Sequence, residues 1–341
     1  MRVDRRAFLS GGAAGLAALL APRPASAALN AVVAGPVVKP PHLEPGDTIG
    51  LINPVSLPMS PADLGSVANA LGSLGMKVKC GARLDVAASD QERAAEVNTL
   101  FADPTVKAIL PVRGGWGSAR LLPHLDYRTI RRNPKVLMGF SDISALLLGV
   151  NARAGLVTFH GPMGISSWVP FTVEQMKRIL FHRQAVKLAC PSAEDGPEGG
   201  VRTIVPGRAR GCLIGGNLTV LSSIVGSPYL GGRGDLVLFL EDVREPYSEV
   251  ARKLTQLELA GILRRVRGVV FGQCTRCDPP VANAQLTLER VLQDQLEPLR
   301  IPAFSGALIG HIDRQLTLPI GVRVEIDADE GSIQLLEAAV C

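Results

Sequence analysis

A serine at the end of a buried strand is the first residue in this sequence that could act as a nucleophile. The apolar run 136–140 leads directly into Ser141, and a helix-like apolar run follows from residue 143. A serine on such a turn holds its hydroxyl clear of the backbone, beside the unpaired N–H groups of a helix start. The match to a Gly-x-Ser-x-Gly elbow is partial, because position 143 is Ile. The alternative interpretation is that Ser141 only caps a helix over 143–155.

A serine nucleophile needs a base that takes its proton and an acid that orients the base. Three of the five histidines lie in a leader or in polar helix-end contexts, which leaves His160 and His311 as candidate bases. Glu241 and Asp242 directly follow a buried strand and are the candidate acids. Any of these four could equally be a structural residue, and the residue pattern alone does not assemble a triad.

The elements that position these residues alternate between strands and helices. A short strand with its turn is predicted over 46–54, and further strands near 77–80, 106–112, 135–139 and 156–160, with helices over 62–76, 90–102 and 143–155 between them. This order predicts an α/β fold with a parallel sheet, in which ligands gather at the carboxyl ends of the strands. Arg113, Ser141 and His160 all follow such ends.

A second α/β unit is expected after a segment of turn-forming residues. We predict an N-terminal domain over 43–189, a linker over 190–201 and a C-terminal domain over 202–341. Strands near 236–240 and 269–272, helices over 248–263 and 284–296, and a closing hairpin over 323–336 are expected there. The second unit contains no Gly-x-Gly-x-x-Gly sequence and no P-loop, which gives nucleotide binding little support.

The N-terminus predicts export. Arg5 and Arg6 form a twin-arginine signal, a short apolar stretch follows, and the small residues 25–27 offer a cleavage site after Ala27. The apolar run of about 11 residues is too short to span a bilayer, which needs about 20. We therefore expect a signal peptide over 1–27, an extended leader over 28–42, and a periplasmic mature protein with no stable membrane span.

Charge and cysteine content exclude further classes. The net charge of +5 includes +3 from the signal, where four arginines oppose Asp4, so the mature chain is near +2 and no nucleic-acid partner is expected. Cys274 and Cys277 form a C-x-x-C pair without a second ligand pair, so packing or an incidental disulfide is favoured over metal or redox work.

The chain resembles the LD-carboxypeptidase (muramoyltetrapeptide carboxypeptidase) family, which also contains the microcin C self-immunity hydrolases. Seven ordered motifs carry the resemblance, and they span nearly all of the mature chain: 46–49 with Asn53-Pro54, Arg113-Gly-Gly-Trp-Gly117, Gly139-Phe-Ser-Asp142, His160-Gly-Pro-Met163, Gly215-Gly-Asn-Leu218, Leu240-Glu-Asp242, and Gly310-His311 with Pro319-Ile-Gly321.

The resemblance implies a Ser–His–Glu triad of Ser141, His311 and Glu241. It also implies an amidotransferase-like N-terminal domain, a C-terminal α/β domain and an active site at their interface, with no metal or cofactor and with a homodimer as a common state. The expected reaction removes a terminal D-alanine from the L-centre residue, diaminopimelate or lysine, of a peptidoglycan tetrapeptide. Trp116 departs from the tyrosine common in the family, and the export signal departs from the cytoplasmic location typical of cell-wall recycling.

Further roles are expected around the triad. The backbone amides of Gly115 and Asp142 are the candidate oxyanion donors. Arg113 is the candidate cation for a substrate carboxylate, though it could equally be structural. His160 is expected to support the site from beneath the nucleophile turn, and the Asp142 side chain to act as a local cap.

Two other functions stay open from the sequence. One is hydrolysis of an amide in a peptide–nucleotide antibiotic, which the low aromatic content of 4% mildly disfavours because base stacking needs aromatic side chains. The other is a non-catalytic exported binding protein, which would have no need of three intact triad positions.

Overall fold

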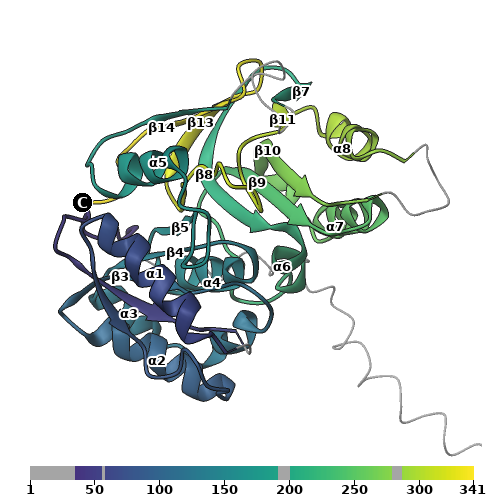
Figure 1. The fold of residues 1–341 in the computed structure, drawn as a ribbon. Coiled ribbons are helices and arrows are strands. Elements are labelled where there is room, and N and C mark those ends of the chain that lie inside the picture. Colours follow the sequence, from purple (N-terminus) through teal and green to yellow (C-terminus); the bar gives the residue numbers. More distant parts are fainter. Residues whose placement is uncertain (1–34, 56–57, 191–199, 279–285) are drawn as a thin grey trace, which may run out of the picture.

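The first of two sheets forms the lower lobe in Figure 1. The computed structural model describes residues 35–55, 58–190, 200–278 and 286–341. The sheet has the order β12-β5-β4-β3-β1-β2, and all its neighbours are parallel except β12 with β5. Its strands are β1 (Thr48–Ile52), β2 (Lys77–Cys80), β3 (Val106–Pro111), β4 (Val136–Gly139), β5 (Thr158–His160) and β12 (Leu318–Ile320).

Helices connect these strands as the apolar spacing predicts. The Ser89 side chain accepts from Glu92 N while the Glu92 side chain accepts from Ser89 N, which is the capping box that starts the second helix. The helical segments of this lobe are α1 (Pro61–Ser73), α2 (Asp90–Ala102), η2 (Ser118–His124), α3 (Tyr127–Arg132), η3 (Ser141–Ile143), α4 (Ser144–Ala154) and α5 (Pro170–Leu180).

The second sheet, in the upper lobe, has eight strands in the order β6-β14-β13-β8-β9-β10-β11-β7. Its centre, from β8 to β11, is parallel and its flanks are antiparallel. The strands are β6 (Lys187–Ala189), β7 (Arg202–Val205), β8 (Arg208–Asn217), β9 (Leu236–Val243), β10 (Val266–Thr275), β11 (Ala303–Ser305), β13 (Arg323–Asp327) and β14 (Ser332–Leu335).

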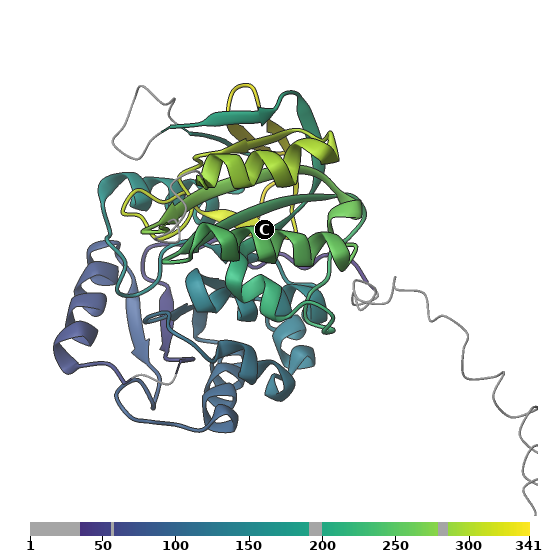
Figure 2. The same ribbon diagram turned by 90° about the vertical axis from the view of Figure 1, so that its right-hand side faces the viewer.

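Helices α7 and α8 lie side by side along the second sheet in both views (Figures 1 and 2). The helical segments here are α6 (Leu218–Ser223), α7 (Tyr247–Leu259), η4 (Leu263–Arg265), α8 (Leu288–Leu296) and η5 (Glu297–Leu299). The predicted two-domain α/β class and the closing hairpin of β13 and β14 are therefore confirmed.

Two short strands cross between the lobes. β6 precedes the predicted linker but pairs with β14 in the second sheet. β12 comes from the C-terminal half but pairs with β5 in the first sheet. The chain thus passes between the two sheets more often than a single linker over 190–201 would require, and residues 191–199 of that linker lie outside the described residues. Residues 1–34, with the predicted signal and most of the predicted leader, also lie outside them.

The contact between the lobes depends on a glycine at the end of β8. A Cβ on Gly216 would lie 2.6 Å from the Ser144 hydroxyl of the first lobe. This close approach lets Asn217 N donate to Ser144 Oγ at 3.0 Å. The start of α4, beside the nucleophile turn, is therefore fastened directly to the second sheet.

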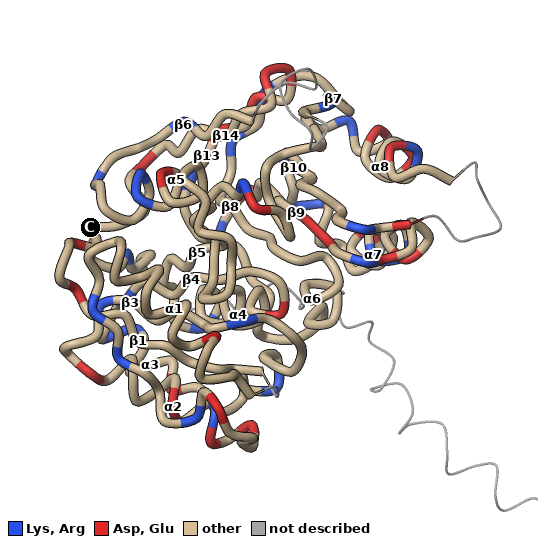
Figure 3. Tube along the Cα trace, in the orientation of Figure 1, with Lys and Arg blue, Asp and Glu red and all other residues tan. Residues whose placement is uncertain are grey.

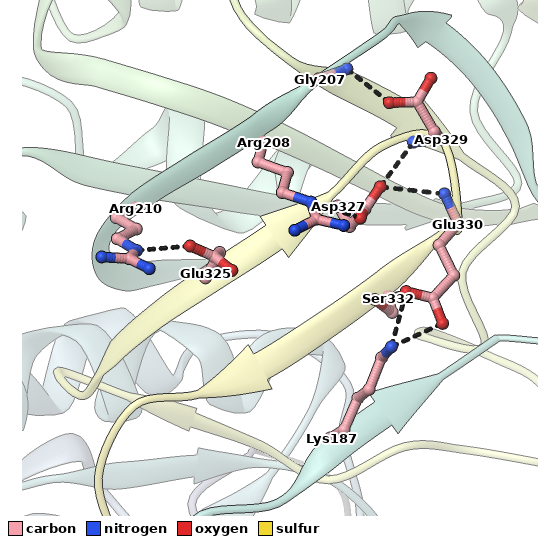
Figure 4. A network of polar contacts seen from close by, with 9 residues as sticks. All are labelled: Lys187, Gly207, Arg208, Arg210, Glu325, Asp327, Asp329, Glu330 and Ser332. Atoms are coloured by element: carbon pink, nitrogen blue, oxygen red, sulfur yellow. Dashed lines mark hydrogen bonds and ion pairs between the residues drawn. The ribbon is translucent and has the colours of Figure 1, made fainter.

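Ion pairs fix the register of the outer strands of the second sheet (Figure 4). Arg208 faces Asp327 across β8 and β13 at 2.7 Å, and Arg210 likewise contacts Glu325. Such directly opposed charges favour one pairing register, although exposed pairs contribute little to overall stability.

Elsewhere basic and acidic residues are interspersed over both lobes (Figure 3). None of the helices in the described residues is long and apolar enough to cross a membrane.

Candidate active site

The nucleophile turn has the backbone of a strained elbow. Ser141 has a φ of +61°, a left-handed conformation that a non-glycine residue adopts at a cost of about 1–3 kcal/mol. Neither η3 nor α4 has a side-chain cap, since their N-cap residues are Phe140 and Ile143. The interpretation of Ser141 as a helix cap is therefore wrong, and its hydroxyl is directed elsewhere.

The partial Gly-x-Ser-x-Gly match has a packing explanation. A Cβ on Gly139 would lie 2.8 Å from Cγ2 of Ile143, which is itself fully buried. Gly139 thus makes room for an isoleucine where the usual elbow has a second glycine.

The hydroxyl of Ser141 meets His311. The distance from Ser141 Oγ to His311 Nε2 is 3.0 Å, and His311 Nδ1 lies 2.8 Å from Glu241 Oε2. With Glu241 ionised, Nδ1–H donates to the carboxylate and Nε2 accepts from the serine hydroxyl. The three side chains come from η3, from β9 and from the loop after β11, so the contact joins both lobes.

Glu241 and its neighbour Asp242 differ in their surroundings because successive side chains of a strand point to opposite faces. Asp242 accepts from Asn217 Nδ2 at 3.1 Å and from the Thr219 hydroxyl at 2.8 Å. Burial, followed by the nearby Glu241, raises the pKa of Asp242 to about 6 despite these bonds. Asp242 therefore holds the start of α6, and Glu241 alone reaches His311.

The loop that carries His311 is anchored to the first lobe. Thr172 on α5 donates its hydroxyl to Asp313 O at 2.6 Å and accepts from Gln315 N at 2.9 Å. Gly310, with a φ of +115°, lies so close to Glu241 that a Cβ would sit 2.7 Å from Oε2. The Phe140 ring packs edge-on against His311 at 4.9 Å. These contacts fix the imidazole between the acid and the hydroxyl.

His160 lies beneath this site and does not contact Ser141. It is the last residue of β5 and is 1% exposed. Burial lowers its pKa to about 4, so the imidazole is neutral at neutral pH. The expectation that His160 supports the site from beneath agrees with this position, and His311 is the histidine in contact with the serine.

The glycine-rich turn after β3 lies against the nucleophile. A Cβ on Gly114 would lie 3.3 Å from Ser141 Oγ, so only a glycine leaves this space open. The Asp142 carboxylate accepts from Ser118 N at 2.9 Å, and Ser118 Oγ donates to Asp142 O. Asp142 is therefore not a local cap as predicted, since it ties the nucleophile turn to η2, 24 residues away in the sequence. Its burial raises its pKa.

Arg113 and Trp116 flank the same turn. Arg113 is partly buried, and its Nε has no hydrogen-bond partner among the described residues. Trp116 is 57% exposed, which is unusual for an indole. Trp116 is thus available for contact with a ligand, whereas the Arg113 Nε is buried.

The C-x-x-C pair is oxidised. Cys274 and Cys277 form a disulfide across the end of β10, so the disulfide interpretation is confirmed. Within the described residues, no group of three or more His, Cys, Asp and Glu side chains could hold a metal ion.

Sequence reasoning missed the residues that hold the site together across the chain. They are Ser118, Ser144, Thr172, Asn217 and Gly310. Asn217 and Gly310 lie within quoted motifs, which was the only available signal. The serines and Thr172 act through contacts that sequence spacing does not reveal.

Comparisons with known proteins identify the family and the fold. Family models described as LD-carboxypeptidase N-terminal domain and LD-carboxypeptidase C-terminal domain match residues 49–161 and 210–326. A probable murein peptide carboxypeptidase of Bacillus subtilis is 35% identical over 313 residues, covering 89% of this chain and 95% of the relative. The microcin C7 self-immunity protein MccF of Escherichia coli is 32% identical over 273 residues, covering 72% and 78%. The structure of muramoyltetrapeptide carboxypeptidase from Oxalobacter formigenes superimposes with a TM-score of 0.73 at 28% identity, covering 84% of this chain and 97% of that one.

Proposed function

This chain belongs to the LD-carboxypeptidase family, and from that premise we propose that it is a serine-type carboxypeptidase acting on peptidoglycan tetrapeptides. The bond cleaved joins the L-centre of diaminopimelate or lysine to a terminal D-alanine. The observation that carries the proposal is the continuous contact from Ser141 through His311 to Glu241. A serine, a base and an orienting acid in this order are what acyl transfer requires.

In the proposed mechanism, His311 takes the proton of Ser141 as the hydroxyl attacks the carbonyl before D-alanine. Glu241 keeps Nδ1 protonated and stabilises the imidazolium that forms. His311 then gives the proton to the leaving amine of D-alanine, and a water molecule hydrolyses the acyl-enzyme by the same steps. The side chains alone provide these proton transfers.

The oxyanion formed on attack needs preorganised donors. Asp142 N is among the first N–H groups of η3, and the first N–H groups of a helix have no acceptor within that helix. Gly115 N lies in the turn that packs against Ser141. Loss of one such donor typically lowers kcat by about 10²–10³. Arg113, whose side chain is partly exposed beside the same turn, is the proposed contact for the terminal carboxylate of the substrate.

The site of action is proposed from the N-terminal sequence. The twin arginines Arg5 and Arg6 and the small residues before Ala28 support export by the twin-arginine route and release into the periplasm. There the protein would meet peptidoglycan in the wall. A homodimer is proposed from the family alone, and light scattering of the mature protein tests it.

The proposed reaction is tested with mature protein from Ala28 onward and with Ser141→Ala as control. Each is incubated with a disaccharide tetrapeptide ending in diaminopimelate–D-alanine, and the products are followed by mass. Loss of one alanine with the wild type only is the expected result. Cleavage of a peptidyl-nucleotide amide with an intact tetrapeptide would support the immunity-type activity instead. If folded protein cleaves neither, a binding function replaces the proposal.

A further inference from the structure

We propose that His160 is a positioning residue for the triad, which favours the ionised and correctly oriented form of Glu241 from the side of the carboxylate oxygen that His311 does not use. This inference deepens the proposed function and rests on its triad. It assigns a role to a buried titratable side chain that the reaction steps above do not employ.

The first observation is a pair of complementary unsatisfied groups. Glu241 is fully buried, and its Oε1 has no hydrogen-bond partner in the described residues. His160 is 1% exposed, and neither of its ring nitrogens has a partner there. A buried carboxylate oxygen and a buried imidazole N–H are each costly when unpaired, and the two groups are complementary as acceptor and donor. No direct hydrogen bond joins them in the described residues, so the imidazole acts on the carboxylate through its dipole.

The second observation is the position of His160 between the two lobes. His160 pairs with Gly139 of β4 and with Leu318 of β12. Its ring packs edge-on against Phe239 at 5.2 Å. Phe239 and Glu241 project to the same face of β9, because they are two residues apart. The imidazole thus lies beside the face of the strand that carries the acid.

The third observation concerns His311. Phe140 packs edge-on against both imidazoles, at 6.2 Å from His160 and 4.9 Å from His311. His160 therefore sits below the base and the acid, separated from solvent by the nucleophile turn. A side chain in this place can affect the acid–base pair without touching the substrate.

The charge state of His160 suits this role. Its charged form is disfavoured by burial and by the nearby His311, and it is favoured by Glu241. Besides His160 and His311, the titratable group next to Glu241 is Asp242, whose pKa is raised by burial and by Glu241. A neutral imidazole stabilises the Glu241 anion by its N–H dipole and adds no positive charge that would make His311 a weaker base.

The test compares three variants of the mature enzyme. His160→Phe keeps the aromatic packing and removes both nitrogens, whereas His160→Gln keeps a donor. Thr317→Val is the matched control, because Thr317 is also fully buried, its hydroxyl has no partner among the described residues, and it lies next to Gly161. Circular dichroism and thermal melting establish that each variant is folded.

Two readouts are measured from pH 4.5 to 8.5. The first is kcat and KM for release of D-alanine. The second is the rate at which a fluorophosphonate labels Ser141, which does not depend on the carboxypeptidase substrate. We expect His160→Phe to lower kcat and the labelling rate by about 10- to 100-fold with KM little changed. We also expect the same fold loss in both readouts, because the change acts on the acid–base pair and not on binding of the substrate.

The same experiment separates the inference from the proposed function. His160→Gln should recover most of the rate in both readouts, and Thr317→Val should match the wild type. Unchanged profiles in His160→Phe, or equal losses in the Phe and Gln variants with both folded, would overturn the role. If the wild type is labelled with the expected His160 dependence but releases no D-alanine, the substrate assignment fails and the positioning role stands.

Discussion

Replacing Gly310 by alanine should disable the triad although none of its three residues is replaced. An added Cβ would lie 2.7 Å from Glu241 Oε2 and 3.0 Å from Glu241 Cβ, whereas ordinary contact starts near 3.4 Å. To restore ordinary contact, the carboxylate must move away from the new Cβ by roughly 0.7 Å. It is buried in a close-packed interior, so the collision cannot be relieved without displacing it. Its contact with His311 Nδ1 would lengthen from 2.8 Å to as much as about 3.5 Å, beyond a useful hydrogen bond.

The expected loss follows from that displacement. Misplacement of a catalytic group by about 1 Å lowers the rate by roughly 10²-fold, which corresponds to about 2.7 kcal/mol of lost transition-state stabilisation. We expect kcat for D-alanine release to fall by about this factor in Gly310→Ala, with KM changed much less. Steady-state kinetics with the disaccharide tetrapeptide, together with the rate of fluorophosphonate labelling, provides the measurement.

A matched variant separates the collision from backbone strain. Gly46 also has a positive φ, +96° against +115° for Gly310, but a Cβ there would meet nothing within 4 Å. Both alanine variants should lose about 1–3 kcal/mol of unfolding free energy from the strained backbone. Only Gly310→Ala should lose activity. Equal losses of activity in the two variants, or full activity in Gly310→Ala, would refute the reasoning.

Three further outcomes are expected. Glu241→Gln should lower kcat by about 10³–10⁴ with little change in KM, because a buried amide no longer enforces the required tautomer of His311; a kcat within tenfold of wild type would argue against the orienting role. The unfolding free energy of the wild type should fall as the pH is lowered from 6.5 to 4, because the unfolded chain takes up a proton in this window that folded His160, with its pKa of about 4, does not. Urea titrations should show that the unfolding free energy of His160→Phe falls by up to about 3 kcal/mol less than that of the wild type over this pH range. An equal fall in both proteins would contradict the burial argument. The double variant Cys274→Ser/Cys277→Ser should have an unfolding free energy about 2 kcal/mol lower than that of the oxidised wild type. Wild type treated with dithiothreitol should match the variant. Identical stability of the wild type with and without reductant would count against a structural disulfide.

The sequence predicts the candidate site better than it predicts what surrounds it. A serine after an apolar strand is visible as a pattern, and the ordered motifs select His311 over His160 and Glu241 over Asp242. The pattern alone could not make these choices. Adjacent residues of a strand face opposite sides, and which side meets the histidine depends on how two sheets dock.

The contacts between distant segments show the same limit. The neighbouring sequence predicts a local cap at Asp142, but its partner is Ser118 in another turn. Nothing in the spacing of Ser144 and Asn217 indicates that a backbone amide of one lobe binds a hydroxyl of the other. Strands β6 and β12, with three residues each, are not among the predicted strands. Their places in the sheets depend on pairing between distant segments, which local spacing does not reveal.

The places of β6 and β12 have a consequence for how the molecule can be divided. Each lobe is completed by a strand from the other half of the sequence, so a cut in the segment between 190 and 201 would leave both fragments with an unpaired sheet edge. Such edges invite aggregation, and neither fragment would be a natural unit for separate expression. Mixed together, the two fragments would have to exchange strands before either sheet was whole. The lobe that carries the nucleophile and the lobe that carries its acid are in this sense obliged to fold as one.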